Sequence, residues 1–100
     1  MAEVVWTEPA LQGLDAIAEY IALDSPAAAS RLVQEMFNKT KRLGDFPQSE
    51  RIPPELPDSV YSELVVPPCR IFYREGESDV LVLYVMREER QLRAYMLGIR

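Results

Sequence analysis

Arginines and aromatic side chains in the last third of the chain are the groups best suited to binding or catalysis. Residues 87–100 carry four arginines against two glutamates, a net charge of +2, whereas residues 1–86 carry seven basic and fourteen acidic side chains, a net of −7. Guanidinium groups bind phosphates and carboxylates, and arginine beside an aromatic ring is common at protein interfaces. The charge reversal therefore predicts a binding surface. The candidate partner-binding residues are Arg70, Phe72, Arg74, Arg87, Arg90, Arg93 and Tyr95.

Several kinds of catalytic and metal site are excluded by composition. The 100 residues include no histidine and a single cysteine, Cys69. Histidine general acid–base catalysis, a Ser-His-Asp triad and a histidine or zinc site are therefore excluded. The four glycines are isolated in the sequence, so a glycine-rich phosphate loop is absent too. We expect no metal and no cofactor, and we expect Cys69 to be a small buried hydrophobic residue.

Length and hydropathy predict one domain, residues 1–100, in the cytoplasm. The sequence lacks the roughly 18 consecutive apolar residues that a membrane span needs, and its start lacks a basic segment followed by an apolar run. A lone cysteine cannot form an internal disulfide, which favours a reducing compartment. The net charge of −5 weighs against general nucleic-acid binding, and no membrane partner is expected.

Apolar spacing in the first half of the chain predicts a strand followed by a helical hairpin. Residues 2–6 read as a strand, and residues 8–23 and 26–43 have the i, i+3, i+4 spacing of amphipathic helices. Thr7 and Ser25 precede the two helices as N-caps. Leu32 and Phe37 fall on the stripe expected to face inward. The proline-rich residues 44–60 should form a long loop.

The second half predicts three strands and a basic tail. Residues 61–66, 69–74 and 80–86 should form an antiparallel meander, with 80–86 central because it is apolar on both faces. Residues 88–97 read as a short basic helix or tail. The order β-α-α-β-β-β predicts a two-layer α+β fold, in which the antiparallel helical hairpin packs on one face of an antiparallel β-sheet.

The other face of that sheet lacks an obvious cover in the sequence. Alternation along residues 69–74 places Arg70, Phe72 and Arg74 on this face, where they would form an exposed interaction surface. A structural role is an equally good interpretation of Arg70, because cross-strand pairing with Glu63 or with other exposed carboxylates would neutralise it. The two alternatives differ in whether the guanidinium is available to a partner.

Four segments, in this order and spacing, resemble the RelE/ParE toxin superfamily, and its ParE branch in particular. The second segment departs from the family's loop pattern, because Glu50 stands in place of a glycine. Together the segments cover nearly the whole chain. They are VVWTEPALQGLDAIAEYIALDSPAAASRLV at 4–33, RLGDFPQSERIPPEL at 42–56, YSELVVPPCRIFYRE at 61–75 and VLVLYVMREERQLRAYM at 80–96.

The resemblance implies the toxin of a type II toxin–antitoxin system, with two possible targets. RelE-type members cut messenger RNA in the ribosomal A site, and ParE-type members poison DNA gyrase. In a nuclease, Arg70, Arg87, Arg90 and Tyr95 would be the catalytic residues. A general base is missing, since the chain has no lysine where RelE-type enzymes use lysines and Glu63 is the only nearby carboxylate. We therefore expect a gyrase inhibitor and not an enzyme.

The same resemblance implies a cognate ParD-like antitoxin as the main partner, in a toxin–antitoxin hetero-oligomer. An acidic, apolar antitoxin segment that folds on binding would suit the Arg70–Arg74 face and the basic tail. Operator DNA would be contacted only through the antitoxin. Two alternatives to the gyrase inhibitor stay open: a ribosome-dependent endoribonuclease, and a relative without toxicity that serves only to bind antitoxin and assist repression.

Overall fold

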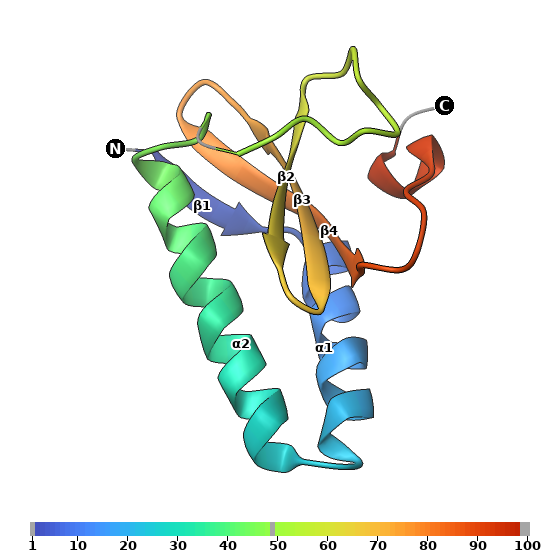
Figure 1. Ribbon diagram of the computed structural model, residues 1–100. Helices are drawn as coiled ribbons and strands as arrows, with labels where there is room; N and C mark the ends of the chain where they lie inside the picture. The colour runs from blue at the N-terminus through green and yellow to red at the C-terminus, as the bar shows by residue number, and fades with distance from the viewer. Residues whose placement is uncertain (1, 49, 99–100) are drawn as a thin grey trace.

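The computed structural model describes residues 2–48 and 50–98, and it shows an α+β fold as expected (Figure 1). A single four-stranded sheet has the order β1-β4-β3-β2. The helices form a hairpin between β1 and β2 in the sequence. The elements are β1 (Glu3–Trp6), α1 (Glu8–Ala22), α2 (Pro26–Lys41), the 3-10 turn η1 (Arg42–Gly44), β2 (Tyr61–Val66), β3 (Cys69–Glu75), β4 (Asp79–Arg87) and the 3-10 turn η2 (Ala94–Leu97).

The sheet is mixed, which corrects the expectation of an all-antiparallel sheet. Strands β2, β3 and β4 form the predicted antiparallel meander, but β1 pairs in parallel with β4, with Val4 opposite Val80. The two helices separate β1 from β2 in the sequence, so the three later strands lie on one side of β1, with β4 next to it. Because β4 lies between β1 and β3 and is covered on both faces, its side chains are apolar on both sides.

Different contacts start the two helices. The hydroxyl of Ser25 caps α2 as predicted, accepting a hydrogen bond from the Ala28 N–H at 3.1 Å. Thr7 holds the cap position of α1, yet its hydroxyl donates to the carbonyl oxygen of Val82 at 2.8 Å. Thr7 therefore anchors the start of α1 to the central strand instead of capping the helix.

The helical hairpin packs its apolar stripe on one face of the sheet. Ala10, Leu14, Leu32 and Met36 from the helices are buried against strand residues that include Ile71. Gly13 allows α1 to approach β4 closely, since a Cβ at this position would lie 3.0 Å from the carbonyl oxygen of Val85. This face is the main core of the molecule.

The second face of the sheet is covered, which contradicts the expectation of an open face. Phe72 and Met86 are fully buried there beneath Leu92 and Leu97 of the C-terminal segment. The loop between η1 and β2 adds Leu56 to the same cluster, and Figure 1 shows this loop meeting the C-terminal segment near η2. A second small core thus occupies the predicted interaction surface. Arg100, in the predicted basic tail, lies outside the described residues.

The prediction that Phe37 faces inward on the helical stripe is also wrong. Leu32 is buried as predicted, whereas the Phe37 side chain is 40% exposed. Its ring packs against Trp6, with 4.8 Å between the ring centroids and a tilted geometry. Phe37 therefore sits on the outer rim of the hairpin and not in the core.

Adjacent residues of α2 should differ sharply in their contribution to stability. Met36→Ala should lower the free energy of unfolding by about 2–5 kcal/mol, because it opens a cavity in a fully buried site. Phe37→Ala should cost only about 1 kcal/mol, the size of one aromatic pair at the surface. Urea unfolding of both variants measures the difference. Equal losses would mean that the outward placement of Phe37 is incorrect.

Candidate functional site

Arg70 lies at the centre of a buried ionic network on the second face of the sheet. Its side chain is 7% exposed, and it contacts the carboxylates of Glu55 and Glu63. The Nη2 atom lies 2.6 Å from Glu55 Oε1 and 2.5 Å from Glu63 Oε1. Glu63 is itself fully buried and also pairs with Arg51, whose Nε lies 2.8 Å from Glu63 Oε2. Two arginines and two glutamates thus neutralise one another, with Arg51 at the exposed end of the network.

The sheet register explains how Arg70 meets Glu63. Antiparallel pairing sets Val65 opposite Arg70 and Glu63 opposite Phe72, so Glu63 and Arg70 are diagonal neighbours on one face. Glu63 was one of the carboxylates named for the structural alternative for Arg70, and the structure shows this pair. Glu55 was missed because it lies in the proline-rich loop, where no periodicity points to a partner.

The network also fastens the C-terminal segment to the loop. The Leu92 N–H donates to Glu55 Oε2 at 2.9 Å, and Arg70 Nη1 donates to the Arg90 carbonyl oxygen at 3.1 Å. Arg70 also lies over the Phe72 ring, with Cζ 4.9 Å from the ring centroid. One guanidinium therefore joins β3, β2, the loop and the C-terminal segment.

Every donor of the Arg70 guanidinium is occupied. A guanidinium has five N–H groups. Nε donates to Glu63, Nη1 donates to Glu55 and to the Arg90 carbonyl, and Nη2 donates to Glu55 and Glu63. Hydrogen bonds from Arg70 lower the pKa of Glu55 to about 2, and the two carboxylates raise the pKa of Arg70. A phosphate could bind Arg70 only by displacing one of these carboxylates.

The expected surface of Arg70, Phe72 and Arg74 does not exist as a unit. Phe72 is completely buried under the C-terminal segment, and Arg70 is neutralised and nearly buried. Arg74 is exposed further along β3. The expectation that Arg70 and Phe72 dock a partner is therefore wrong for this conformation, because neither side chain is accessible.

The basic residues of the C-terminal segment lie at the surface, and they differ in their contacts. Arg87 donates from Nε to Glu89 at 2.8 Å, and this contact raises the pKa of Arg87 and lowers that of Glu89. Arg90 and Arg93 are exposed. Tyr95, on η2, is 72% exposed. Their role in binding a partner stays a prediction.

Two other groups singled out by chemistry are structural. Cys69 is fully buried, and burial raises the pKa of its thiol to about 11, so little thiolate forms near neutrality. Tyr73 is buried in the main core and donates from its hydroxyl to the Pro47 carbonyl at 2.7 Å.

In the part of the chain that the structure describes, no cluster of acidic or cysteine side chains could hold a metal. No helix there is long and apolar enough to cross a membrane.

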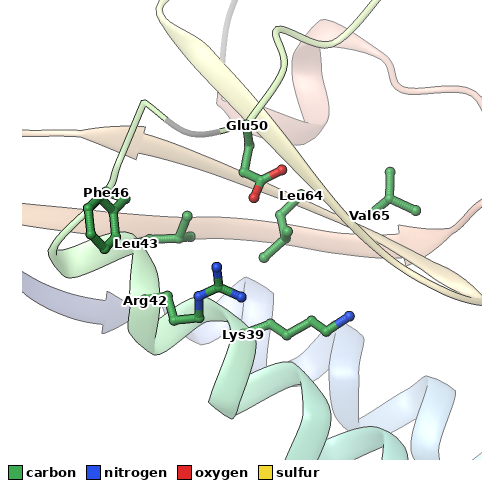
Figure 2. Close-up of a pocket in the computed structure, with 7 residues that line it drawn as sticks. All are labelled: Lys39, Arg42, Leu43, Phe46, Glu50, Leu64 and Val65. Carbon is green, nitrogen blue, oxygen red and sulfur yellow. The ribbon is translucent and has the colours of Figure 1, made fainter.

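A mixed concavity of about 280 Å³ lies where the end of α2 faces β2 (Figure 2). Lys39 and Arg42 reach it from α2 and η1, and the Glu50 carboxylate points toward them from the loop. Lys39 also pairs with Glu35 at 3.2 Å, one helical turn earlier. Leu64 and Val65 of β2 complete one wall. Its charges are of both signs, so it is no preformed phosphate site.

A trough with several exposed apolar side chains runs along the outer side of the helical hairpin. Three concavities of about 540, 510 and 490 Å³ run along the hairpin, the first two sharing Val33 and the last two sharing Phe37. Leu11 is 43% exposed within it. Sequence analysis missed this feature, since it assigned the whole helical stripe to the core. We define the hairpin trough by Trp6, Leu11, Leu14, Ala18, Ala22, Val33 and Phe37.

Comparisons with known proteins agree with the fold. The family described as "ParE toxin of type II toxin-antitoxin system, parDE" matches residues 4–92. A relative called Toxin RelE2, from Caulobacter vibrioides, is 35% identical over 91 residues, which cover 90% of this chain and 99% of the relative. A solved structure described as a chromosomal ParDE TA system from P. aeruginosa superimposes with a TM-score of 0.74 at 28% identity. It covers 89% of this chain and 98% of the matched chain.

Removing the Glu55 carboxylate should flatten the acid dependence of stability. Because the pKa of Glu55 in the folded chain is about 2 instead of 4.5, its contribution is complete above pH 4.5 and is lost as the pH falls toward 2. Between pH 4.5 and pH 2, the free energy of unfolding of the wild type should fall by about 3 kcal/mol more than that of Glu55→Gln. Urea unfolding at stepped pH measures this loss. Glu77→Gln, at an exposed turn, is the control, and its stability should change with pH as that of the wild type does. The same pH dependence of stability in all three proteins would contradict the proposed role of Glu55 in the network.

Proposed function

The chain belongs to the ParE toxin family of type II toxin–antitoxin systems, and on this premise we propose that it inhibits DNA gyrase by protein–protein contact and is neutralised by a cognate antitoxin. The observation that supports gyrase over messenger RNA as the target is the state of Arg70. In the nuclease alternative this arginine would have to bind a phosphate. Here all five of its N–H groups are already used.

The carboxylate that the sequence offered as a base for RNA cleavage is also inaccessible. Glu63 was the only carboxylate that sequence placed near the candidate arginine, and its side chain is fully buried between Arg51 and Arg70. A fully buried carboxylate that two guanidinium groups hold is inaccessible to a ribose hydroxyl. The remaining nuclease candidates are Arg87, which is paired with Glu89, and the exposed Arg90 and Tyr95. These side chains supply no general base.

The overall charge favours a protein target as well. The chain has a net charge of −5, and phosphate backbones repel such a surface unless a concentrated basic patch compensates. The C-terminal arginines are interrupted by Glu88 and Glu89, one of which neutralises Arg87. A toxin that inhibits gyrase needs shape and contact complementarity to a protein surface, and it needs no catalytic base.

Growth arrest by this chain should proceed through gyrase. Purified chain added to gyrase should block supercoiling and accumulate cleaved DNA, while primer extension on ribosome-bound message should show no A-site cleavage. Tyr95→Phe and Arg90→Ala should leave message uncut, whatever their effect on supercoiling inhibition. Message cleavage by the wild type that is lost in Tyr95→Phe would establish the nuclease instead. A chain that causes no arrest would be a relative retained only to bind antitoxin.

The surface that best suits the antitoxin is the hairpin trough. Both faces of the sheet are covered, whereas the trough is open and is lined in part by exposed apolar side chains. Small side chains at Ala18 and Ala22 let a partner helix approach α1 closely, and the larger Phe37 gives it an anchor. An amphipathic helix of the antitoxin laid in the trough would bury its apolar face there. This replaces the docking face expected from Arg70 and Phe72.

A charge placed in the trough should weaken the antitoxin complex. Leu11→Lys should raise the Kd of the cognate antitoxin at least about tenfold, because burial of the ammonium would oppose docking. Leu23→Lys is the matched control: Leu23 is 83% exposed just beyond α1 and lines no part of the trough, so its Kd should not change. Surface plasmon resonance measures both. Equal affinities for the two variants would show that the trough is not the docking surface.

A further inference from the structure

Two segments that contain no strand cover the second face of the sheet, and they meet near η2 (Figure 1). We define the strap as residues 52–60 of the loop before β2 together with residues 89–98 of the C-terminal segment. Within the described residues, the backbone hydrogen bonds of the strap are local, as from Leu56 to Pro53 and from Met96 to Arg93, both at 3.0 Å. Local bonds of this kind stabilise turns but do not attach a segment to a sheet. Side-chain contacts therefore hold the strap in place.

Glu55 joins both parts of the strap to β3. Its carboxylate accepts hydrogen bonds from Arg70 Nη1 at 2.8 Å and Nη2 at 2.6 Å, and from the Leu92 N–H at 2.9 Å. Leu56 and Leu92 also pack in one small core with Phe72. Loss of either part would therefore remove hydrogen-bonding and packing partners of the other. Segments that depend on each other in this way open cooperatively.

The ends of the strap are attached to the sheet independently of Glu55. Arg51 forms an isolated antiparallel bridge with Glu63 of β2, whose N–H donates to the Arg51 carbonyl oxygen at 2.7 Å. At the start of the C-terminal part, the Glu88 N–H donates to the Pro68 carbonyl oxygen at 2.9 Å. The helical hairpin and the sheet form their own core on the opposite face. The strap can therefore lift from the sheet while the rest of the chain stays folded.

We propose that the strap opens as one unit, with Glu55 as its latch, and that it gates access to Arg70 and Phe72. The inference goes beyond the proposed function, because it concerns a movement of this chain alone. In the open state the Arg70 guanidinium loses Glu55 and the Arg90 carbonyl oxygen, but it keeps Glu63, which belongs to β2. The donors of Nη1 then face solvent, beside the uncovered Phe72 ring. The arginine and aromatic face expected from the sequence is thus hidden by the strap in the closed state.

Native-state amide exchange of the ¹⁵N-labelled chain tests whether the strap opens as one unit. The Leu56 and Ser59 amides report on the loop part, and the Leu92 and Met96 amides report on the C-terminal part. All four reporter amides should give one opening equilibrium constant. That constant should exceed the one for the Met36 amide, in the middle of α2, at least about tenfold, because the strap opens without unfolding the hairpin. Different constants for the two parts would overturn the proposal.

A substitution in one part of the strap should also loosen the other part. Glu55→Gln in the loop and Leu92→Ala in the C-terminal part should each speed exchange of all four reporter amides by one common factor, at least about tenfold. Leu32→Val is the control in the main core. It should speed exchange of the Met36 amide and leave the reporter amides unchanged, because the open strap keeps that core intact.

Two results of this variant series would overturn the proposal. Acceleration confined to the part that carries the substitution would show that the two parts open separately. Acceleration of the reporter amides by Leu32→Val would show that they exchange only through global unfolding. If Leu92→Ala does not fold, Glu55→Gln and the control decide between these outcomes.

Chemical modification of arginine tests what the opening uncovers. Phenylglyoxal reacts with accessible guanidinium groups, and peptide mass spectrometry gives the rate for each arginine. In the wild type, Arg70 should react at least about tenfold more slowly than the exposed Arg31 of α2. Glu55→Gln should raise the Arg70 rate by the factor found for the reporter amides, because both measure one opening, and it should leave the Arg31 rate unchanged. A constant Arg70 rate despite faster exchange of the reporter amides would show that the strap does not gate Arg70.

Discussion

The buried pairing of Arg70 with two carboxylates is the constraint on which the second half of the structure depends. Removing an arginine from water costs several kcal/mol unless its donors are all satisfied. Glu63 comes from the neighbouring strand, but Glu55 must be carried in by the loop, and the Leu92 N–H completes the coordination of that carboxylate. The loop and the C-terminal segment contain little regular structure of their own, so this network and the small core around Phe72 are what hold them on the sheet.

The same pairing decides whether an arginine at this place in the fold has a structural or a catalytic role. An arginine on this strand can stabilise a phosphorane only if donors are directed at an open site. In this chain Glu55 and the buried Glu63 take those donors, and the C-terminal segment closes over them. The fold alone is compatible with either activity. The carboxylates around Arg70 make the protein-binding activity the better supported one.

Local patterns in the sequence predicted the elements well, and nonlocal contacts account for what they missed. Both helices and the meander follow from apolar spacing, whereas the Arg70–Glu63 pair was only one of the pairings open to Arg70, because the face of Glu63 was not fixed by the pattern. The cover over Phe72 could not be predicted, because it comes from aperiodic segments whose apolar residues have no repeat to reveal a face. The parallel direction of β1 depends on where the hairpin returns the chain. Phe37 was misplaced because helical spacing does not distinguish a core position from the rim of an exposed trough.

Because both faces of the sheet are covered, the outer side of the helical hairpin is left as an open surface with exposed apolar side chains. The helices cover one face, and the C-terminal segment covers the opposite face. An antitoxin confined to the hairpin trough would therefore leave Arg90 and Arg93 exposed on the other side of the sheet. Neutralisation by direct blocking then requires that gyrase also contacts the hairpin side. If gyrase contacts the C-terminal arginines instead, the antitoxin must extend around an edge of the sheet to reach them.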